Sequence, residues 1–331
     1  SKNQVRRYIR LTELLTDFLD MVDDKRLKFN PAVEILTNGG YDYQTTVKAC
    51  HIIFASSREE FNAVLANLPG TATIIISTYD DLTVLYPDYG VYFDGTYVIG
   101  YVDQVDYDDA IDFLIENNYD YSENGNMSIC AVGDDFSVIT NADINPEATV
   151  RVAVIDTGSN IANEYYSVVG DDGADENGHG TQMVSNILNE TDNAYIISIK
   201  AMGLDGHGGV DDVYAALEYA RELDVDYILL AISIRDNGKY EALRTLITDI
   251  VDEGIVVVAS AGNNNRDASS YIPAGIDGVL TAGAINDDGT KYPMSNYGEC
   301  VEYYVYTTST SNAASILTGR LLNGNTEDIY S

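Results

Sequence analysis

Short apolar segments alternate with amphipathic segments in the second half of the chain. Five runs are rich in β-branched and small residues and hold few polar positions, which is typical of parallel strands buried on both faces. They are residues 151–155, 194–199, 227–232, 255–259 and 278–283. Residues 180–188, 211–223 and 240–253 lie between these runs and have helical periodicity. The alternation predicts a doubly wound, mostly parallel α/β sheet.

The first part of the chain has a different pattern. Residues 5–22 and 107–116 have an apolar side at helical spacing, and residues 73–77, 91–102 and 127–132 resemble strands. The second of these strand segments contains Asp94-Gly95, a favoured hairpin pair. We therefore predict a smaller α+β domain over residues 1–149, with residues 141–149 as its linker, and an α/β domain over residues 150–331.

Composition adds a strong negative charge to this picture. The chain has 53 acidic and 18 basic residues, which gives a formal net charge of -35. Such a field repels nucleic acid and anionic membranes, and it attracts cations and basic peptides. Apolar runs are too short for a membrane-spanning helix. Cys50, Cys130 and Cys300 allow at most one disulfide, of unknown pairing, and lack metal-site spacing.

Four polar residues stand at the ends of apolar segments and are candidate catalytic residues. Asp156 follows an apolar strand, and His179 lies between two glycines at the start of an apolar helix. Asn263 follows another strand, where its amide can donate to a developing oxyanion, and Ser311 precedes a helix of small residues. Each feature alone is equally typical of a turn or a helix cap.

Taken in order, these residues resemble the subtilisin-like serine peptidases. The order of aspartate, histidine and serine distinguishes that family from chymotrypsin and the α/β-hydrolases. The resemblance implies that Ser311 is the nucleophile, that His179 is its general base, and that Asp156 orients the histidine. It also implies that Asn263 and the Ser311 backbone N–H bind the oxyanion. No cofactor is required for this chemistry.

The resemblance extends to the segments against which family substrates lie. A peptide is expected to pair as an added strand with two short stretches of this chain. The implied substrate-binding residues are His207, Gly208, Gly209, Ser233, Ile234 and Arg235. Arg235 stands where the specificity pocket of the family usually has glycine, which is expected to narrow the pocket or to favour acidic side chains. The negative net charge argues against an acidic preference, so the specificity stays open.

The segment around Ser311 departs from the family pattern. Ser309 replaces a glycine, Ser315 replaces a proline, and the chain ends about twenty residues after Ser311. The sequence leaves two functions open: a serine endopeptidase, active or in zymogen form, that acts on peptide or protein substrates, or a catalytically inactive scaffold that binds a partner. A fragment of a longer enzyme is the third alternative.

Residues 1–149 stand where the family carries a propeptide, so the resemblance implies an intramolecular inhibitor or folding chaperone. A separate recognition domain is the rival interpretation. Calcium is common in the family, and the densest acidic cluster is Asp171, Asp172, Asp175 and Glu176. EF-hand spacing is absent, so this cluster is also typical of a solvated loop, and the calcium site stays undefined. Secretion or display at the cell surface is expected.

Overall fold

A computed structural model describes residues 71–77, 90–93, 98–103, 114–115, 120–123, 125–130, 144–169 and 172–324. The chain divides into two compact units, Ser1–Tyr121 and Ser122–Ser331. This division does not test the predicted domains, residues 1–149 and 150–331, because compactness does not say where a mature domain begins. That boundary stays a prediction.

The N-terminal strands form a four-stranded sheet. Its order is β2 (Gly90–Phe93), β3 (Val98–Asp103), β1 (Thr71–Ser77) and β4 (Asp120–Glu123). β2 and β3 pair antiparallel, as the predicted hairpin requires, whereas its predicted turn at Asp94-Gly95 lies outside the described residues. The predicted helix over residues 5–22 lies outside the described residues. Of the helix predicted over residues 107–116, only Leu114 and Ile115 are described, and both are helical.

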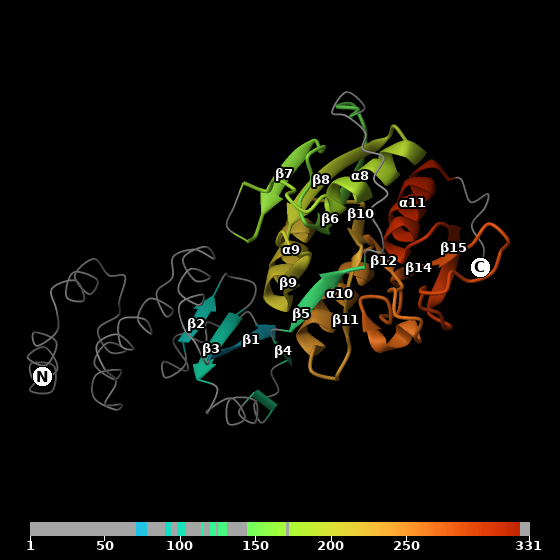
Figure 1. Cartoon of the computed structure of the whole chain (residues 1–331). Coiled ribbons are helices and arrows are strands. Elements are labelled where there is room, and N and C mark those ends of the chain that lie inside the picture. Colours follow the sequence, from blue (N-terminus) through green and yellow to red (C-terminus); the bar gives the residue numbers. More distant parts are fainter. Residues whose placement is uncertain are drawn as a thin grey trace, which may run out of the picture. The chain divides into compact units, whose positions relative to one another are not determined.

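A seven-stranded sheet forms the centre of the second unit (Figure 1). Its order is β15 (Val301–Tyr306), β14 (Leu280–Ile285), β12 (Val256–Ser260), β10 (Tyr227–Leu230), β6 (Val150–Asp156), β8 (Ala194–Lys200) and β7 (Glu164–Ser167). Every neighbouring pair is parallel. The predicted doubly wound α/β fold is therefore confirmed.

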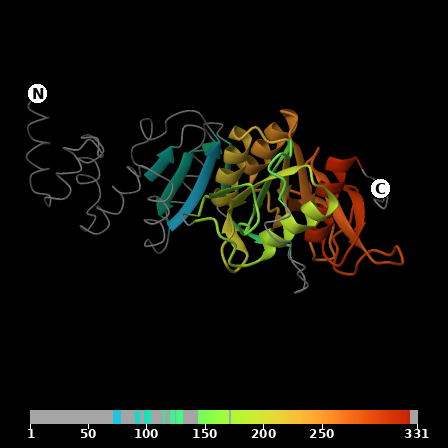
Figure 2. The same ribbon diagram turned by 90° about the horizontal axis from the view of Figure 1, so that it is seen from above.

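Helices cover both faces of the seven-stranded sheet (Figure 2). α8 (His179–Glu190) packs on α11 (Thr310–Asn323), and α9 (Val210–Glu222) packs on α10 (Glu241–Asp252). Apolar residues of β6, β8, β10, β12, α8 and α11 share one buried core. Because these strands are covered on both faces, they lack the alternating polar positions of half-exposed strands.

The predicted strand over residues 227–232 is interrupted. β10 ends at Leu230, and after Ala231 the chain enters β11 (Ile232–Arg235), which belongs to another sheet. That sheet has the order β13 (Tyr271–Ile272), β11, β5 (Asn126–Ile129) and β9 (His207–Gly209). β5 overlaps the strand predicted over residues 127–132, and it lies within the second unit.

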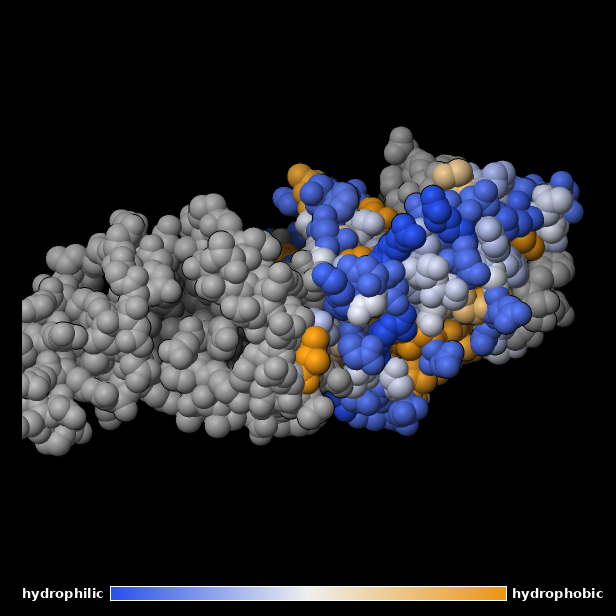
Figure 3. Space-filling view, turned by 90° about the horizontal axis from the view of Figure 1, so that it is seen from below, coloured by the Kyte–Doolittle hydropathy of each residue, from blue (hydrophilic) through white to orange (hydrophobic). Residues whose placement is uncertain are grey.

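The surface of the described part is mainly hydrophilic on the face seen in Figure 3, where apolar residues gather only in small groups. Among the described helices, none is long and apolar enough to cross a membrane. Large apolar side chains that stay exposed include Leu204 and Met294.

Candidate active site

Asp156 and His179 are brought together at the carboxyl edge of the seven-stranded sheet. Asp156 is the last residue of β6, and His179 is the first residue of α8. The Oδ1 atom of Asp156 lies 2.7 Å from Nδ1 of His179, and both side chains are buried. Nδ1–H therefore donates to the carboxylate, which leaves Nε2 as the basic nitrogen. Nε2 has no hydrogen-bond partner in the described part of the chain.

A glycine lets α8 begin this close to the end of β6. A Cβ atom at Gly180 would lie 1.9 Å from the carbonyl oxygen of Gly158 and 3.2 Å from Cβ of Asp156. Only glycine fits such an approach without movement of the backbone. Close packing against the backbone thus explains the second glycine of the Gly-His-Gly sequence, Gly180.

Asp175 organises the loop that leads into α8. It is buried, and its Oδ1 accepts from the hydroxyl of Thr157 and from the backbone N–H groups of Asn177 and Gly178. Its Oδ2 accepts from the backbone and the hydroxyl of Thr181. The sequence placed Asp175 only in an acidic cluster and missed this positioning role.

The described members of the acidic cluster, Asp172, Asp175 and Glu176, do not form a metal site. Among the described residues, no group of three His, Cys, Asp or Glu side chains is placed to hold a metal ion. The carboxylate of Asp172 accepts from the backbone of Ala174, and Asp171 lies outside the described residues. Calcium binding stays an untested prediction.

Ser311 lies in the first turn of α11 and is fully buried. Its hydroxyl donates to the carbonyl oxygen of Ala231 at 3.4 Å, and no hydrogen bond between described groups joins it to His179. The helices that carry the two residues are joined, because Asn186 of α8 donates to Oγ of Ser315 at 2.9 Å and to Oδ1 of Asn312 at 3.1 Å.

Ser309 caps the helix that carries Ser311. Its backbone is extended, with φ -153° and ψ 153°, a conformation open to any residue. Its hydroxyl accepts from the backbone N–H of Asn312 at 3.2 Å. The serine at this position is therefore accommodated without strain and contributes a helix cap.

Asn263 follows β12 and faces the N-terminus of α11. Its Oδ1 accepts from the backbone N–H of Thr310 at 3.1 Å, which fixes the orientation of the carboxamide. Its Nδ2 then donates to the carbonyl oxygen of Cys130. The amide predicted as the oxyanion donor thus binds Cys130, which precedes β6 in the chain.

β5 leads directly into Cys130 and pairs antiparallel with β9 and β11. Ile129 donates its backbone N–H to the carbonyl of Gly206 at 3.0 Å, and Cys130 donates its own to the carbonyl of Ala231 at 3.1 Å. The hydroxyl of Ser311 shares this last acceptor. Ser311 therefore lies beside the residue whose carbonyl oxygen Asn263 holds.

The predicted substrate-binding residues divide into two groups. His207, Gly208, Gly209 and Ser233 pair with β5. Ile234 and Arg235 pair instead with Ile272 and Tyr271 of β13, on the other side of β11. The position predicted for a bound peptide strand is thus occupied by the chain itself. The sequence identified residues 127–132 as a strand but carried no signal for this placement.

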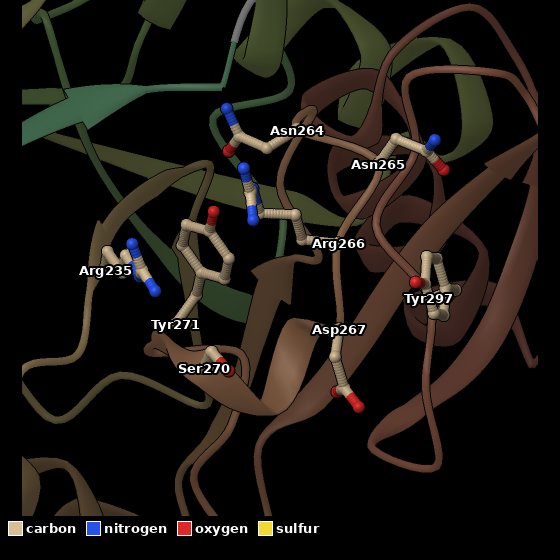
Figure 4. Close-up of a pocket in the computed structure, with 8 residues that line it drawn as sticks. All are labelled: Arg235, Asn264, Asn265, Arg266, Asp267, Ser270, Tyr271 and Tyr297. Carbon is tan, nitrogen blue, oxygen red and sulfur yellow. The ribbon is translucent and has the colours of Figure 1, made fainter.

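A separate open pocket lies where β11 meets the loop after Asn263 (Figure 4). Arg235 and Arg266 stand on two of its sides, with the ring of Tyr271 between them. Its other lining residues are Asn264, Asn265, Asp267, Ser270 and Tyr297.

Comparison with known proteins identifies the family. The sequence model of the subtilase family matches residues 125–330. The chain belongs to the subtilase family. The match begins at the segment that contains β5 and includes Asp156, His179, Asn263 and Ser311.

Similar proteins agree with this assignment. A subtilisin-like serine protease of Rhodotorula mucilaginosa, Rho m 2.0101, is 30% identical over 182 residues, which cover 49% of this chain and 53% of that protein. An extracellular serine proteinase of Thermus sp. (strain Rt41A) is 28% identical over 171 residues, which cover 47% of this chain and 42% of that protein. This subtilase therefore spans about half the length of the curated relatives that it matches.

The crystal structure of a cold-adapted subtilisin-like serine proteinase resembles this subtilase in fold. The TM-score is 0.50 at 19% sequence identity, and the match covers 60% of this chain and 81% of that chain. At this identity the likeness concerns the fold alone.

Proposed function

We propose that this subtilase is a serine endopeptidase in which Asp156, His179 and Ser311 form the charge-relay system. The observation that carries the proposal is the position of Cys130. Its carbonyl oxygen accepts from the amide of Asn263, and its backbone N–H shares an acceptor with the Ser311 hydroxyl. A peptide carbonyl held in this way is placed for attack by a neighbouring hydroxyl.

The chemistry follows from these positions. The Ser311 hydroxyl exchanges the carbonyl of Ala231 for Nε2 of His179, gives it the proton and attacks the peptide carbonyl carbon. Asn263 and the backbone N–H of Ser311 bind the oxyanion. His179 then returns the proton to the leaving amine, and water hydrolyses the acyl-enzyme by the same steps in reverse. Asp156 stays ionised throughout and stabilises the imidazolium.

Residues 126–130 make the chain its own inhibitor in this proposal. β5 fills the place of a substrate strand between β9 and β11, so an added peptide has to displace it. The chain is then a zymogen, and the segment that ends at Cys130 acts as an intramolecular inhibitor. Its first intramolecular substrate is the bond between Cys130 and Ala131.

The proposed enzyme acts on peptides or proteins and works outside the cell or at its surface. The name of the relative from Thermus, an extracellular serine proteinase, supports this location. The net charge of -35 supports solubility there and the attraction of basic peptides.

A catalytically inactive scaffold is the second candidate function. One observation favours it: the Ser311 hydroxyl is fully buried and donates to Ala231, while Nε2 of His179 has no partner in the described part of the chain. A scaffold needs the cleft between β9 and β11 for binding but does not need transfer of the Ser311 proton.

Labelling with a fluorophosphonate probe, read by intact mass, separates the two functions. If the chain is an endopeptidase, the parent chain is expected to react with the probe and Ser311→Ala is not. His179→Ala is expected to react much more slowly than the parent. Ile129→Pro removes the N–H that donates to Gly206 and loosens β5, so it is expected to label faster than the parent. A parent chain and an Ile129→Pro variant that both fail to label would overturn the endopeptidase in favour of the scaffold.

A further inference from the structure

We propose that the cleft selects a small, neutral residue with a hydrogen-bonding group, such as cysteine or serine, on the acyl side of the cleaved bond, and a long apolar residue three positions before it. This inference rests on the proposed endopeptidase function. It treats Met127-Ser128-Ile129-Cys130 as an imprint of the preferred substrate, because these residues occupy the cleft in extended conformation.

The pocket around the Cys130 side chain closes tightly. The residue is 6% exposed, although its side chain has only two heavy atoms. Its thiol donates to the hydroxyl of Ser233 at 3.1 Å. The hydroxyl of Ser260, at the end of β12, lies near this thiol, is fully buried and makes no well-formed hydrogen bond to a described residue. The hydroxyls of Ser233 and Ser260 therefore favour a small side chain that can form a hydrogen bond.

The same pocket disfavours a charged side chain. Burial raises the pKa of the Cys130 thiol, so this side chain is bound in its neutral form. The nearby hydroxyls of Ser233 and Ser260 lower the pKa and oppose this effect, whereas the carboxylate of Asp156 raises it further. An acidic side chain in this place would lose its hydration and face the same carboxylate.

The position of Met127 takes a large apolar side chain, unlike the pocket around Cys130. Met127 is 1% exposed and is among the largest fully buried side chains of the described part. It pairs with Gly208, whose lack of a Cβ lets the strand approach Ala201 and Met202 closely. Ser128 and Ile129 are only half-buried. Burial therefore concentrates recognition on the first and fourth residues of this segment.

Docking of β5 tests the pocket without any need for catalysis. In a Ser311→Ala background, we expect hydrogen exchange at Ile129 and Cys130 to stay slow in Cys130→Ser and to accelerate at least tenfold in Cys130→Phe and Cys130→Glu. Slow exchange in the seven-stranded sheet of every variant shows that the fold is intact. Unchanged exchange in Cys130→Phe would overturn the inference.

Peptide cleavage tests the selection itself. With fluorogenic peptides Met-Ser-Ile-X and the processed enzyme, we expect kcat/KM to be at least tenfold higher for X = Cys, Ser or Ala than for Phe, Glu or Arg, a range that pocket contacts commonly supply. Replacement of Met by Gly should also lower kcat/KM at least tenfold. A preference for Phe, Glu or Arg would overturn the inference and leave the endopeptidase intact.

Ser260→Ala is expected to reduce the preference for Cys or Ser over Ala at X. Ser198→Ala is the matched control, because Ser198 also has a buried hydroxyl without a hydrogen-bond partner among the described residues, but in β8. Equal effects of the two variants would contradict a role for Ser260. Hydrogen exchange that differs among the Cys130 variants as expected, in a chain that never labels with fluorophosphonate, would overturn the proposed endopeptidase function and support the proposed pocket.

Discussion

At the scale of single residues, the placement of Asp156 and His179 depends on side chains outside the proposed charge-relay system. Gly180 lets the helix of His179 approach the strand of Asp156. Asp175 accepts five hydrogen bonds, from Thr157, from Asn177 and Gly178 of the loop, and from Thr181 of α8. The local sequence shows a glycine and an acid at these positions, but their purpose depends on contacts across the chain. The candidate catalytic residues can therefore be predicted more readily than those that position them.

Asp175→Asn tests the positioning of the loop. The neutral amide accepts fewer and weaker hydrogen bonds, and each bond to a charged group contributes about 1.5–3 kcal/mol. We expect a lower Tm and slower fluorophosphonate labelling, measured by calorimetry and intact mass. Asp172→Asn is the control, because Asp172 is exposed and accepts one bond from Ala174. Equal effects of the two substitutions would contradict the assigned role of Asp175.

Glu218 is expected to make stability depend on pH. Burial raises its pKa to about 7, although Arg221 acts in the opposite direction. The folded state holds the Glu218 proton more tightly than the unfolded state. The contribution of Glu218 to the free energy of unfolding is therefore greatest below its usual pKa of 4.5 and falls as pH rises toward 7. Glu218→Gln should therefore raise Tm at pH 8 and have less effect at pH 4. The opposite pH dependence of the difference in Tm would refute this assignment.

At the scale of elements, the parallel strands and three of their covering helices follow from the apolar pattern. The exceptions have physical reasons. Ala231 interrupts an apolar run because the chain changes sheets there, and the run itself carries no sign of the change. β7 and β15 are edge strands with exposed residues, so they lack the continuous apolar pattern of buried strands. The placement of β5 depends on pairing with distant segments, which a single sequence does not reveal.

Gly206→Ala tests the contact that seats β5. Gly206 has φ +75°, and a Cβ there would lie 2.7 Å from Cδ1 of Ile129. We expect faster hydrogen exchange in β5 and faster labelling of Ser311. Gly238→Ala is the matched control, since Gly238 has φ +81° but no atom within 4 Å of the added Cβ. It shares the backbone strain of an alanine at positive φ, roughly 1–2 kcal/mol, and should leave β5 unchanged. If both variants release β5 equally, the Ile129 contact is not what holds it.

At the scale of the whole molecule, two features matter: the net charge and the proposed self-inhibition. The net charge of -35 produces repulsion within the compact state. In the proposed zymogen the chain supplies β5 to its own cleft, so the proposed inhibitory segment has a high effective concentration there.

Salt is expected to stabilise the folded chain. Raising NaCl from about 0.01 M to about 0.1 M shortens the Debye length from about 30 Å to about 10 Å, which screens repulsion among the excess acids. Tm measured by calorimetry should rise over this range, whereas a non-electrolyte at equal osmolarity should have a smaller effect. A fall in Tm with salt would show that attractive ion pairs, such as Arg151–Glu164, outweigh the repulsion.

The most direct test of the central claim is intact-mass analysis, with N-terminal sequencing, of the parent chain and of Ser311→Ala after parallel incubation. We predict that the parent is hydrolysed between Cys130 and Ala131, which gives a product that begins Ala-Val-Gly, and that Ser311→Ala stays whole. A parent chain that is never cut, or a cut at this bond in Ser311→Ala, would contradict the account.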